Sequence, residues 1–298
     1  MELIQLAGDT WYLAGQELIP LYRLDSRRCI LLDSGLGAER EELAAALDRA
    51  GLTPLGVFGS HVHRDHSVNH FWLRERYGTR VCLPRWEAAL CGSPMMLQTV
   101  YGVFPGSLLR DLYGSAVGQT DQEAGPEDGT VDFCGVPLQV IHTPGHTPDH
   151  ICTVTPDGVC YLADALLTGA VLEGARLPYH SNHMVARQSM EKLRAQDRYK
   201  TYLCAHRGTF DRLAPVIDGN LALLDRCAAA IRDLIQGEMG EEEISAAVIR
   251  RAKLLTSSTD KALRYRRNAR AVLDYLVDTR QAELVTRQGI CRYRLVQT

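Results

Sequence analysis

The segment 59–70, GSHVHRDHSVNH, places four histidines and one aspartate within twelve residues. Histidine titrates near neutral pH, is costly to bury as a charged group and is the most common metal ligand in proteins. All ten histidines of the chain lie between residues 61 and 206, with none in the first 60 residues or the last 92. The chain must therefore fold so that its middle segments converge, and we predict that they converge on one functional site.

Within this segment, His61, His63, Asp65 and His66 form the pattern H-x-H-x-D-H. Imidazole nitrogens and carboxylate oxygens suit Zn²⁺ and similar divalent ions. Residues that alternate along an extended loop point in opposite directions, so His61 and His63 can face one ion while Asp65 and His66 face a second. Four ligands cannot saturate two tetrahedral ions, and the pattern therefore predicts further ligands downstream.

Three later residues meet this requirement, because each follows or ends a predicted strand. His146 lies in the Pro-Gly turn of HTPGHTPDH, which brings the backbone close to a ligand. Asp164 ends the stretch YLAD, and His206 ends the stretch YLCAH. Side chains at strand ends can line one rim of a layered sheet, so we predict that these three residues complete the site.

Residues 1–218 alternate short strand signals with helix signals, which predicts an α/β domain. Residues 92–130 have weak periodicity and many glycines, which is typical of a functional or mobile loop. The elements expected elsewhere are strands at 3–6, 10–13, 18–24, 29–33, 55–60, 79–84, 136–142, 150–156, 158–164 and 199–206, and helices at 37–51, 68–78 and 185–196.

Residues 219–298 differ in character from the part that precedes them, and we predict that they form a second, smaller domain. They lack both histidine and proline, and they carry 14 Lys and Arg against 10 Asp and Glu. The pattern predicts three helices, at about 221–236, 241–254 and 261–279. Residues 282–297 alternate around Gln288-Gly289, as expected for a β-hairpin.

The composition is that of an ordinary globular protein, with 46% hydrophobic and 23% charged residues. The net charge of −3 gives no global field that would favour nucleic acid or a membrane surface. The N-terminal residues have neither a basic nor an apolar signal-peptide region, and no apolar run reaches the length of a spanning helix. Nine scattered cysteines without a CxxC pair indicate reduced thiols, so we expect a cytoplasmic protein.

The set SHVHRDH, HTPGHT, LAD and CAH, together with LLDSG at 31–35, resembles the metallo-β-lactamase-fold hydrolases over roughly residues 1–215. The resemblance implies a four-layer αβ/βα sandwich with the site at one edge. It also implies the ligand assignment: His61, His63 and His146 hold one metal, Asp65, His66 and His206 hold the other, and Asp164 bridges both. Lactamases of the cysteine-ligand class carry Cys at the position of Asp164, so the chain is more similar to the glyoxalase II and lactonase branch.

A two-metal centre of this kind supplies a hydrolytic mechanism without a serine or cysteine nucleophile. Two ions about 3.5–4 Å apart clamp a water and lower its pKa from ~15.7 towards ~7, which makes a bridging hydroxide available at neutral pH. Asp65 would act catalytically, as a ligand that also orients this hydroxide. We therefore predict a hydrolase of a small ester, thioester, lactone or amide with two divalent ions, zinc first and iron or manganese as alternatives.

Other polar residues near these motifs have less specific roles. Asp33 ends a strand beside Ser-Gly, where a carboxylate usually accepts backbone N–H bonds and braces a loop, so we interpret it as structural. His70, one helical turn after His66, has a structural interpretation too. The segment 177–184, LPYHSNHM, falls between two ligand positions. Its Tyr179, His180 and His183 are candidates for substrate contact, with a plain polar loop as the alternative.

The predicted helix–helix–helix–hairpin tail resembles a winged helix, a module that some relatives of this fold carry after the catalytic domain. It could close the substrate pocket, make a homodimer contact or read nucleic acid. The run RYRRNAR at 264–270 could touch phosphates, although a solvated helix face is its more common meaning.

Two other functions remain open from the sequence. A nuclease of the same fold could use the basic tail, but the small excess of positive charge argues against strong polyanion binding. Iron redox chemistry is the other alternative, either as a mononuclear oxygenase acting on a thiol-type substrate or as a di-iron electron-transfer protein. The di-iron branch of the fold typically has Glu where this chain has His63, which argues against the electron-transfer option, whereas the ligand types alone are compatible with a mononuclear oxygenase. The partner that we expect is a small-molecule substrate rather than nucleic acid or a membrane.

Overall fold

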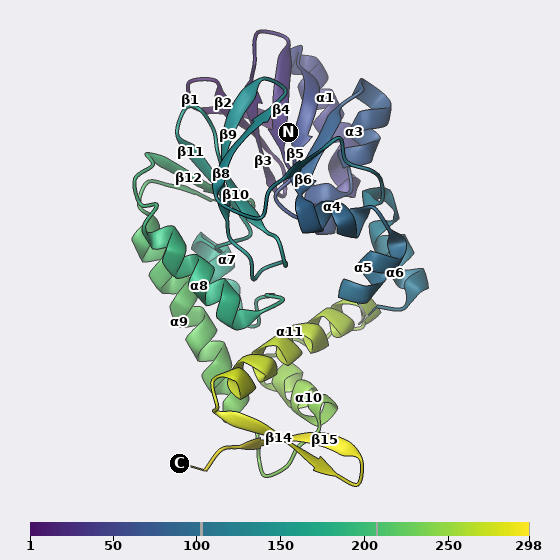
Figure 1. Ribbon diagram of the computed structural model, residues 1–298, viewed down its shortest axis with the longest axis vertical. Helices are drawn as coiled ribbons and strands as arrows, with labels where there is room; N and C mark the ends of the chain where they lie inside the picture. Colours follow the sequence, from purple (N-terminus) through teal and green to yellow (C-terminus); the bar gives the residue numbers. More distant parts are fainter. Residues whose placement is uncertain (102–103, 207, 298) are drawn as a thin grey trace.

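The computed structural model describes residues 1–101, 104–206 and 208–297, so residues 102 and 103 of the expected loop and residue 298 of the expected tail domain lie outside the description. Two mixed sheets face each other, with helices on the outer side of each (Figure 1). A two-stranded sheet lies among the C-terminal helices. The predicted α/β class is confirmed.

The first sheet contains seven strands in chain order. Neighbours from β1 to β4 are antiparallel, and neighbours from β4 to β7 are parallel. The strands are β1 (Glu2–Ala7), β2 (Thr10–Ala14), β3 (Leu18–Arg23), β4 (Arg28–Leu32), β5 (Thr53–Phe58), β6 (Arg80–Pro84) and β7 (Gln122–Ala124).

The second sheet contains six strands in the order β13-β12-β11-β10-β9-β8. Only the β11–β12 pair is parallel. The strands are β8 (Gly129–Phe133), β9 (Val136–His142), β10 (Ile151–Val154), β11 (Val159–Ala163), β12 (Thr201–Cys204) and β13 (Gly208–Phe210).

Helices join and cover these strands. Short 3₁₀ turns precede α1 and follow α6 (Gly37–Glu39 and Gly114–Ala116). The helices of this part are α1 (Arg40–Ala50), α2 (Arg64–Ser67), α3 (His70–Tyr77), α4 (Arg85–Cys91), α5 (Pro94–Val100), α6 (Gly106–Tyr113), α7 (Gly169–Gly174) and α8 (His183–Arg194).

The buried strands send alternate side chains to opposite faces, because the side-chain period of a strand is two residues. In β4, Ile30 faces the second sheet while Leu31 faces the helices outside the first sheet. In β11, Tyr161 faces the first sheet while Leu162 faces the helices outside the second. Both strands are therefore almost continuously apolar, as strands covered on both faces must be.

Three apolar clusters stack to give four layers, as the αβ/βα prediction requires. Leu43 of α1 and Leu73 of α3 pack on the outer face of the first sheet. The two sheets enclose the central cluster, which includes Phe58 and Phe133 with their ring centroids 5.6 Å apart. Leu193 of α8 and neighbouring side chains pack on the outer face of the second sheet.

The C-terminal region consists of α9 (Leu213–Arg232), α10 (Glu241–Arg251), α11 (Thr259–Asp278) and the hairpin β14 (Ala282–Arg287)–β15 (Ile290–Leu295). The hairpin turns at Gln288-Gly289, where both residues have positive φ, as a two-residue type I′ turn requires. The predicted three helices and hairpin are confirmed. Helix α9 crosses residue 218, where the sequence predicts a domain boundary, and it contacts both α8 and α11.

The expectation of an irregular loop at 92–130 is wrong for much of its length. The segment forms α5, α6, β7 and β8. Leu97 and Tyr101, and likewise Leu109 and Tyr113, lie four residues apart and bury one side of each short helix. This tertiary packing outweighs the weak intrinsic propensity of a glycine-rich sequence. Within the described ranges, no helix is long and apolar enough to cross a membrane.

Gly145, in the turn between β9 and β10, holds that turn against α8. Its φ is +123°, and a Cβ there would lie 2.3 Å from the backbone nitrogen of Ala186. Its carbonyl oxygen accepts hydrogen bonds from the amide of Asn182 and the hydroxyl of Ser181. The turn can therefore approach the helix this closely only with glycine.

We expect Gly145→Ala to lower the free energy of unfolding by at least about 1–3 kcal/mol, the usual cost of backbone strain, with the overlap on α8 added. Denaturant unfolding would measure the change. Gly129→Ala is the matched control, because no atom lies within 4 Å of its added Cβ and its φ is not positive. Equal unfolding midpoints for the two variants would contradict this account.

Candidate metal centre

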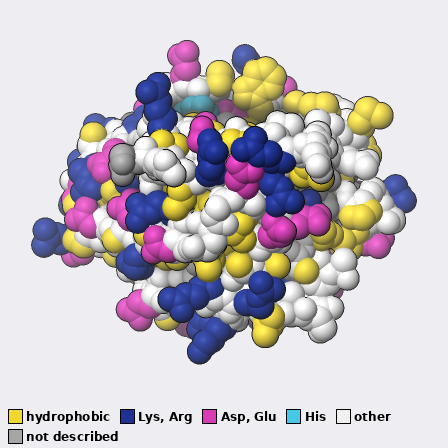
Figure 2. Space-filling view, turned by 90° about the horizontal axis from the view of Figure 1, so that it is seen from below, with side chains coloured by type: hydrophobic (Ala, Val, Ile, Leu, Met, Phe, Trp, Pro, Cys, Tyr) yellow, Lys and Arg dark blue, Asp and Glu magenta, His cyan; other side chains and the backbone are white. Residues whose placement is uncertain are grey.

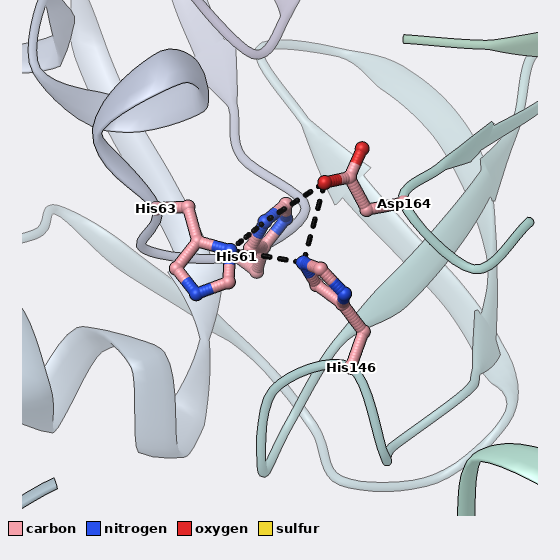
Figure 3. A group of neighbouring side chains, drawn as sticks. All are labelled: His61, His63, His146 and Asp164. Carbon is pink, nitrogen blue, oxygen red and sulfur yellow. Dashed lines mark hydrogen bonds and ion pairs between the residues drawn. The ribbon is translucent and has the colours of Figure 1, made fainter. Parts of the chain in front are cut away.

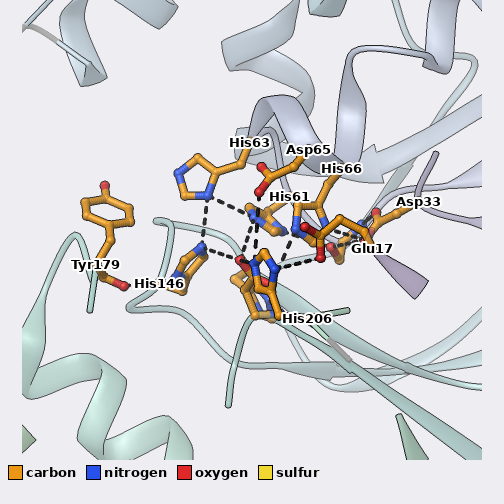
Figure 4. Close-up of polar contacts among 12 residues, drawn as sticks. Glu17, Asp33, His61, His63, Asp65, His66, His146, Tyr179 and His206 are labelled. Carbon is orange, nitrogen blue, oxygen red and sulfur yellow. Dashed lines mark hydrogen bonds and ion pairs between the residues drawn. The ribbon is translucent and has the colours of Figure 1, made fainter. Parts of the chain in front are cut away.

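The seven predicted ligands lie together at one end of the two sheets (Figures 3 and 4). Strands β9 and β11 run in the same direction because each is antiparallel to β10, and β12 is parallel to β11. Their carboxyl ends therefore meet at one rim, and the loop after β5 approaches it from the first sheet. His61 and His63 come from that loop, Asp65 and His66 from α2, His146 from the β9–β10 turn, Asp164 from the end of β11 and His206 from the segment after β12.

The first cluster consists of His61, His63, His146 and Asp164, all of which are buried (Figure 3). The Nδ1 atom of His63 lies 3.0 Å from Nε2 of His61 and 2.9 Å from Nε2 of His146. The Oδ2 atom of Asp164 lies 3.2 Å from Nε2 of His146 and 4.0 Å from Nε2 of His61. Four potential ligand atoms thus face one point.

The second cluster consists of Asp65, His66 and His206 (Figure 4). The Nε2 atom of His206 lies 4.0 Å from Oδ2 of Asp65. Asp164 reaches this cluster as well, because its Oδ2 lies 3.3 Å from Nε2 of His206 and its Oδ1 lies 3.4 Å from Nε2 of His66. The carboxylate of Asp164 therefore lies between the two clusters and contacts both.

Four of these histidines, all except His63, have a partner for the other ring nitrogen, which orients the ring. The partners are Ser60 Oγ at 2.9 Å from His61 Nδ1, Asp33 Oδ2 at 2.8 Å from His66 Nδ1, the Tyr179 carbonyl oxygen at 3.1 Å from His146 Nδ1, and Glu17 Oε2 at 2.6 Å from His206 Nδ1. Partners of this kind fix which nitrogen of a histidine is free to ligate. In all four, Nε2 is left to face the clusters.

The arrangement fits a pair of metal ions. Nitrogen and oxygen ligands at 2.0–2.1 Å from a tetrahedral ion lie about 3.3 Å from one another, which is close to the separations within the first cluster. Nε2 of His66 and Oδ1 of Asp164 are buried and lie 3.4 Å from each other, and neither makes a hydrogen bond to any other described residue. Buried polar atoms are normally well satisfied, and an ion between these two atoms would serve as a partner for both.

The two clusters differ in their electrostatics. Burial, with the repulsion of neighbouring imidazoles, lowers the pKa of His61 and His63 well below the usual value. Burial also opposes the charge of His66, but the carboxylates of Asp164 and Asp33 raise the pKa of His66 well above the usual value. The charge of Asp164 raises the pKa of His206 to about 11. In the metal-free protein, His66 and His206 are therefore protonated at neutral pH, whereas His61 and His63 are neutral.

Asp33 lies behind the second cluster and bridges the two sheets. Its carboxylate accepts hydrogen bonds from the amide and the hydroxyl of Ser60, both at 2.6 Å, and from the hydroxyl of Tyr161 at 2.7 Å. It also contacts His66, as described above. These contacts are those of a bracing carboxylate, which is the role that the sequence suggests.

Two histidines outside the ligand set lie nearby but face other partners. His70 contacts Ser34 Oγ through Nδ1 at 2.8 Å. His150 contacts Thr143 Oγ1 at 2.9 Å and accepts a bond from the amide of Asp164. Both are fully buried, and burial lowers the pKa of His70 to about 4 and that of His150 to about 3. They are neutral supports of the ligand loops.

Two buried glutamates near the site, Glu17 and Glu87, are not predicted from the sequence. Glu87, in α4, accepts hydrogen bonds from the amides of Val62 and Asp149, so it ties the H-x-H loop to the His146 turn. Burial raises the pKa of Glu87 to about 7. A glutamate in the first turn of a short helix usually faces solvent, and nothing in the pattern around either residue signals its contact with the site.

A cavity of about 400 Å³ opens onto the clusters. Its walls come from the metal-ligand loops, from α6, from the segment 178–180 and from α11. Tyr179 and His180, two candidates for substrate contact, line it. His183 is buried beside His180, with ring centroids 5.5 Å apart, and is not among the described residues that line the cavity.

The model of the metallo-beta-lactamase superfamily matches residues 15–206, which include all seven ligands. The chain belongs to the metallo-beta-lactamase superfamily. The match includes the histidine-rich clusters that could hold metal ions. The buried clusters correspond to the dinuclear site that is typical of the superfamily.

Curated relatives within the superfamily are similar to part of the chain. A hydroxyacylglutathione hydrolase of Thiobacillus denitrificans is 29% identical over 208 residues, which cover 68% of this chain and 66% of the relative. Another of Rhizobium meliloti is 30% identical over 165 residues, which cover 52% and 54%. The matches thus span less than two thirds of the length of these relatives.

Solved structures of superfamily members share the fold over nearly the whole chain. A beta-lactamase domain protein of Burkholderia ambifaria has a TM-score of 0.72 at 17% identity and covers 99% of this chain and 94% of its own. A metallo-beta-lactamase family protein of Thermus thermophilus has a TM-score of 0.69 at 19% identity and covers 97% and 99%. The metallo-beta-lactamase fold with a C-terminal helical region is therefore shown.

The electrostatic difference between the two clusters predicts proton release on metal binding. At pH 7, His66 and His206 hold protons on the Nε2 atoms that a metal ion would displace, whereas His61 and His63 are already neutral. Titration calorimetry of Zn²⁺ into the metal-free protein, in buffers of different ionisation enthalpy, should show release of at least about two protons per chain, one from each of these two imidazolium groups. The release should decline as the pH rises past about 11, the pKa of His206. A heat that does not depend on the buffer would contradict the assignment.

Proposed function

We propose that this protein is a dinuclear, zinc-dependent hydrolase of small acyl thioesters. The observation that carries the proposal is the complete set of seven nitrogen and oxygen donors, with Asp164 shared between two clusters at the base of a cavity. Two ions bound there would supply an activated water and polarise the carbonyl group under attack.

The relatives support a thioester over the other substrates that such a centre can hydrolyse. Several of them are hydroxyacylglutathione hydrolases, whose named substrates join an acyl group to a thiol. The match to each relative covers only part of that protein, so the relatives' names do not identify the acyl and thiol groups of this chain's own substrate. Esters and lactones have the same reacting carbonyl and are the next candidates.

Residues of the chain would orient the reactants. Asp65 is half-buried, lines the cavity and lies 4.0 Å from His206, so its carboxylate can accept a hydrogen bond from the attacking water. Tyr179 and Tyr113 form apolar wall beside the clusters and would limit the access of bulk water. His180, which also lines the cavity, is placed to contact the substrate.

We further propose that the C-terminal region is a winged-helix-like module that serves the cavity rather than nucleic acid. Figure 2 shows basic and acidic side chains interspersed over its face. Many of its arginines are paired with carboxylates, among them Arg287 with Glu238 at 2.6 Å and Arg270 with Glu241 at 2.7 Å. Such pairs leave little free positive charge for phosphates, which supports a small-molecule partner.

The test of the proposal combines metal analysis with an activity survey. Purified protein should contain two zinc ions per chain and should hydrolyse a hydroxyacyl thioester faster than a lactone, a β-lactam or a phosphodiester. One iron per chain with oxygen consumption would instead establish the oxygenase alternative. Hydrolysis of the phosphodiester alone would establish the nuclease alternative.

Asp65→Asn should lower kcat for the thioester by about a hundredfold or more, which is within the range of positioned acid–base groups. Asparagine keeps the size of the side chain but removes the negative charge that anchors the second ion and orients the water. The loss should therefore fall on kcat with less change in KM, as steady-state kinetics would show.

His70→Ala is the control for this substitution, because His70 is buried near the site but faces Ser34. Its free energy of unfolding should fall while its zinc content stays at two ions per chain. Near-normal turnover of Asp65→Asn, with the thioester that the wild type hydrolyses, would show that the two-metal mechanism is wrong.

A further inference from the structure

Arg267 lies on α11, in the C-terminal region, and its side chain lines the metal-site cavity. Its guanidinium carbon lies 3.7 Å from the ring centroid of Tyr179, 5.4 Å from that of Tyr101 and 5.9 Å from that of Phe104. Three aromatic rings from two separate segments therefore surround the guanidinium group.

No carboxylate of the described residues forms an ion pair with Arg267, although other arginines of the same helix are paired. Arg264 contacts Asp260 at 2.7 Å, and Arg266 contacts Glu241 at 3.5 Å and Glu242 at 3.3 Å. The Nε and Nη1 atoms of Arg267 are buried and have no hydrogen-bond partner within the described ranges. Arg267 thus differs from these two arginines in its lack of a paired carboxylate.

A half-buried guanidinium group with two buried, unsatisfied donors is costly, because a buried donor without a partner loses its hydrogen bond to water, and the loss is larger when the group is charged. A cation over an aromatic ring recovers only part of this cost. An anion in the cavity would supply the missing partner, and its hydrogen bonds to a guanidinium edge are of the strong, charge-assisted kind.

The acidic side chains of the cavity are already engaged. Asp65 and Asp164 belong to the metal clusters, and Asp260 is paired with Arg264. The rings of Tyr179 and Tyr101, which both contact Arg267, lie 5.3 and 5.8 Å from the ring of His63. A molecule that reaches the metal centre with its carbonyl group can therefore reach Arg267 with a substituent.

We propose that Arg267 binds an anionic oxygen group of the substrate, a carboxylate or a phosphate, and thereby makes the enzyme selective for acyl thioesters that carry such a group. The inference rests on the proposed thioester hydrolysis, which it extends to a substrate class. Arg267 is a specificity-determining residue in this account, and it takes no part in the bond that breaks.

A matched series of thioesters tests this selectivity. Acetyl thioesters of mercaptoethanol, mercaptopropionate and mercaptoethyl phosphate are respectively neutral, carboxylate-bearing and phosphate-bearing on the thiol half. The succinyl thioester of mercaptoethanol carries its carboxylate on the acyl half. The member of the series that the wild type prefers identifies both the kind of anion and the half that carries it.

Arg267→Met should lower kcat/KM for the preferred anionic thioester by about ten- to a hundredfold, mainly through KM, because it removes hydrogen bonds to a charged group. The neutral thioester should change by less than about twofold. Arg267→Lys keeps the charge without the planar fork and should retain part of the preference. Arg266→Met, one residue away and paired on the surface, is the control and should leave all four values unchanged.

Equal losses on neutral and anionic thioesters, or no loss on either, would overturn the proposal. Failure of the wild type to hydrolyse any of the four would overturn the proposed function instead. In that case the role of Arg267 is tested by binding instead of hydrolysis. The zinc-loaded protein is titrated calorimetrically with ketone analogues of the four thioesters, in which a methylene group replaces the thioester sulfur. Tighter binding of an anionic ketone by the wild type than by Arg267→Met supports the subsite, and equal binding overturns it.

Discussion

The contact of one carboxylate with histidines of both clusters is the constraint on which the structure depends. Asp164 is buried at the end of β11, and the charges of His206 and His66 hold its pKa well below the usual range although burial opposes ionisation. A buried charge of this kind is tolerable only when it is paired. The loops after β5, β9 and β12 must therefore meet at Asp164, and the two sheets fix where those loops begin.

The sequence predicts this site far better than it predicts the walls around it. The ligands could be found because each is a chemically distinctive residue at the end of an apolar strand, as with His206 after YLCA. Glu87 and Arg267 could not, since an acidic residue in a first turn and an arginine in a basic run usually face solvent. Their burial depends on α4, α5 and α6, whose packing is tertiary and leaves only a weak periodic signal.

The predicted metal ligands and part of the cavity wall come from different segments of the chain. Residues 15–206 match the superfamily and contain every ligand, whereas Arg264 and Arg267 lie beyond them on α11. The segment between β6 and β7 adds Tyr101, which is buried against the H-x-H loop through a hydrogen bond from its hydroxyl to the Val62 carbonyl. Arg264 and Arg267 thus belong to the part of the cavity wall that lies outside the superfamily match.

The continuous helix α9 connects the second sheet to the C-terminal region. Its twenty residues, Leu213–Arg232, begin against the second sheet and end among the C-terminal helices, so one continuous rod joins the two parts. A hydrogen-bonded helix lacks the loop residues at which domains usually hinge. Helix α11 packs on α9, so the wall that α11 adds to the cavity is held to the second sheet through α9.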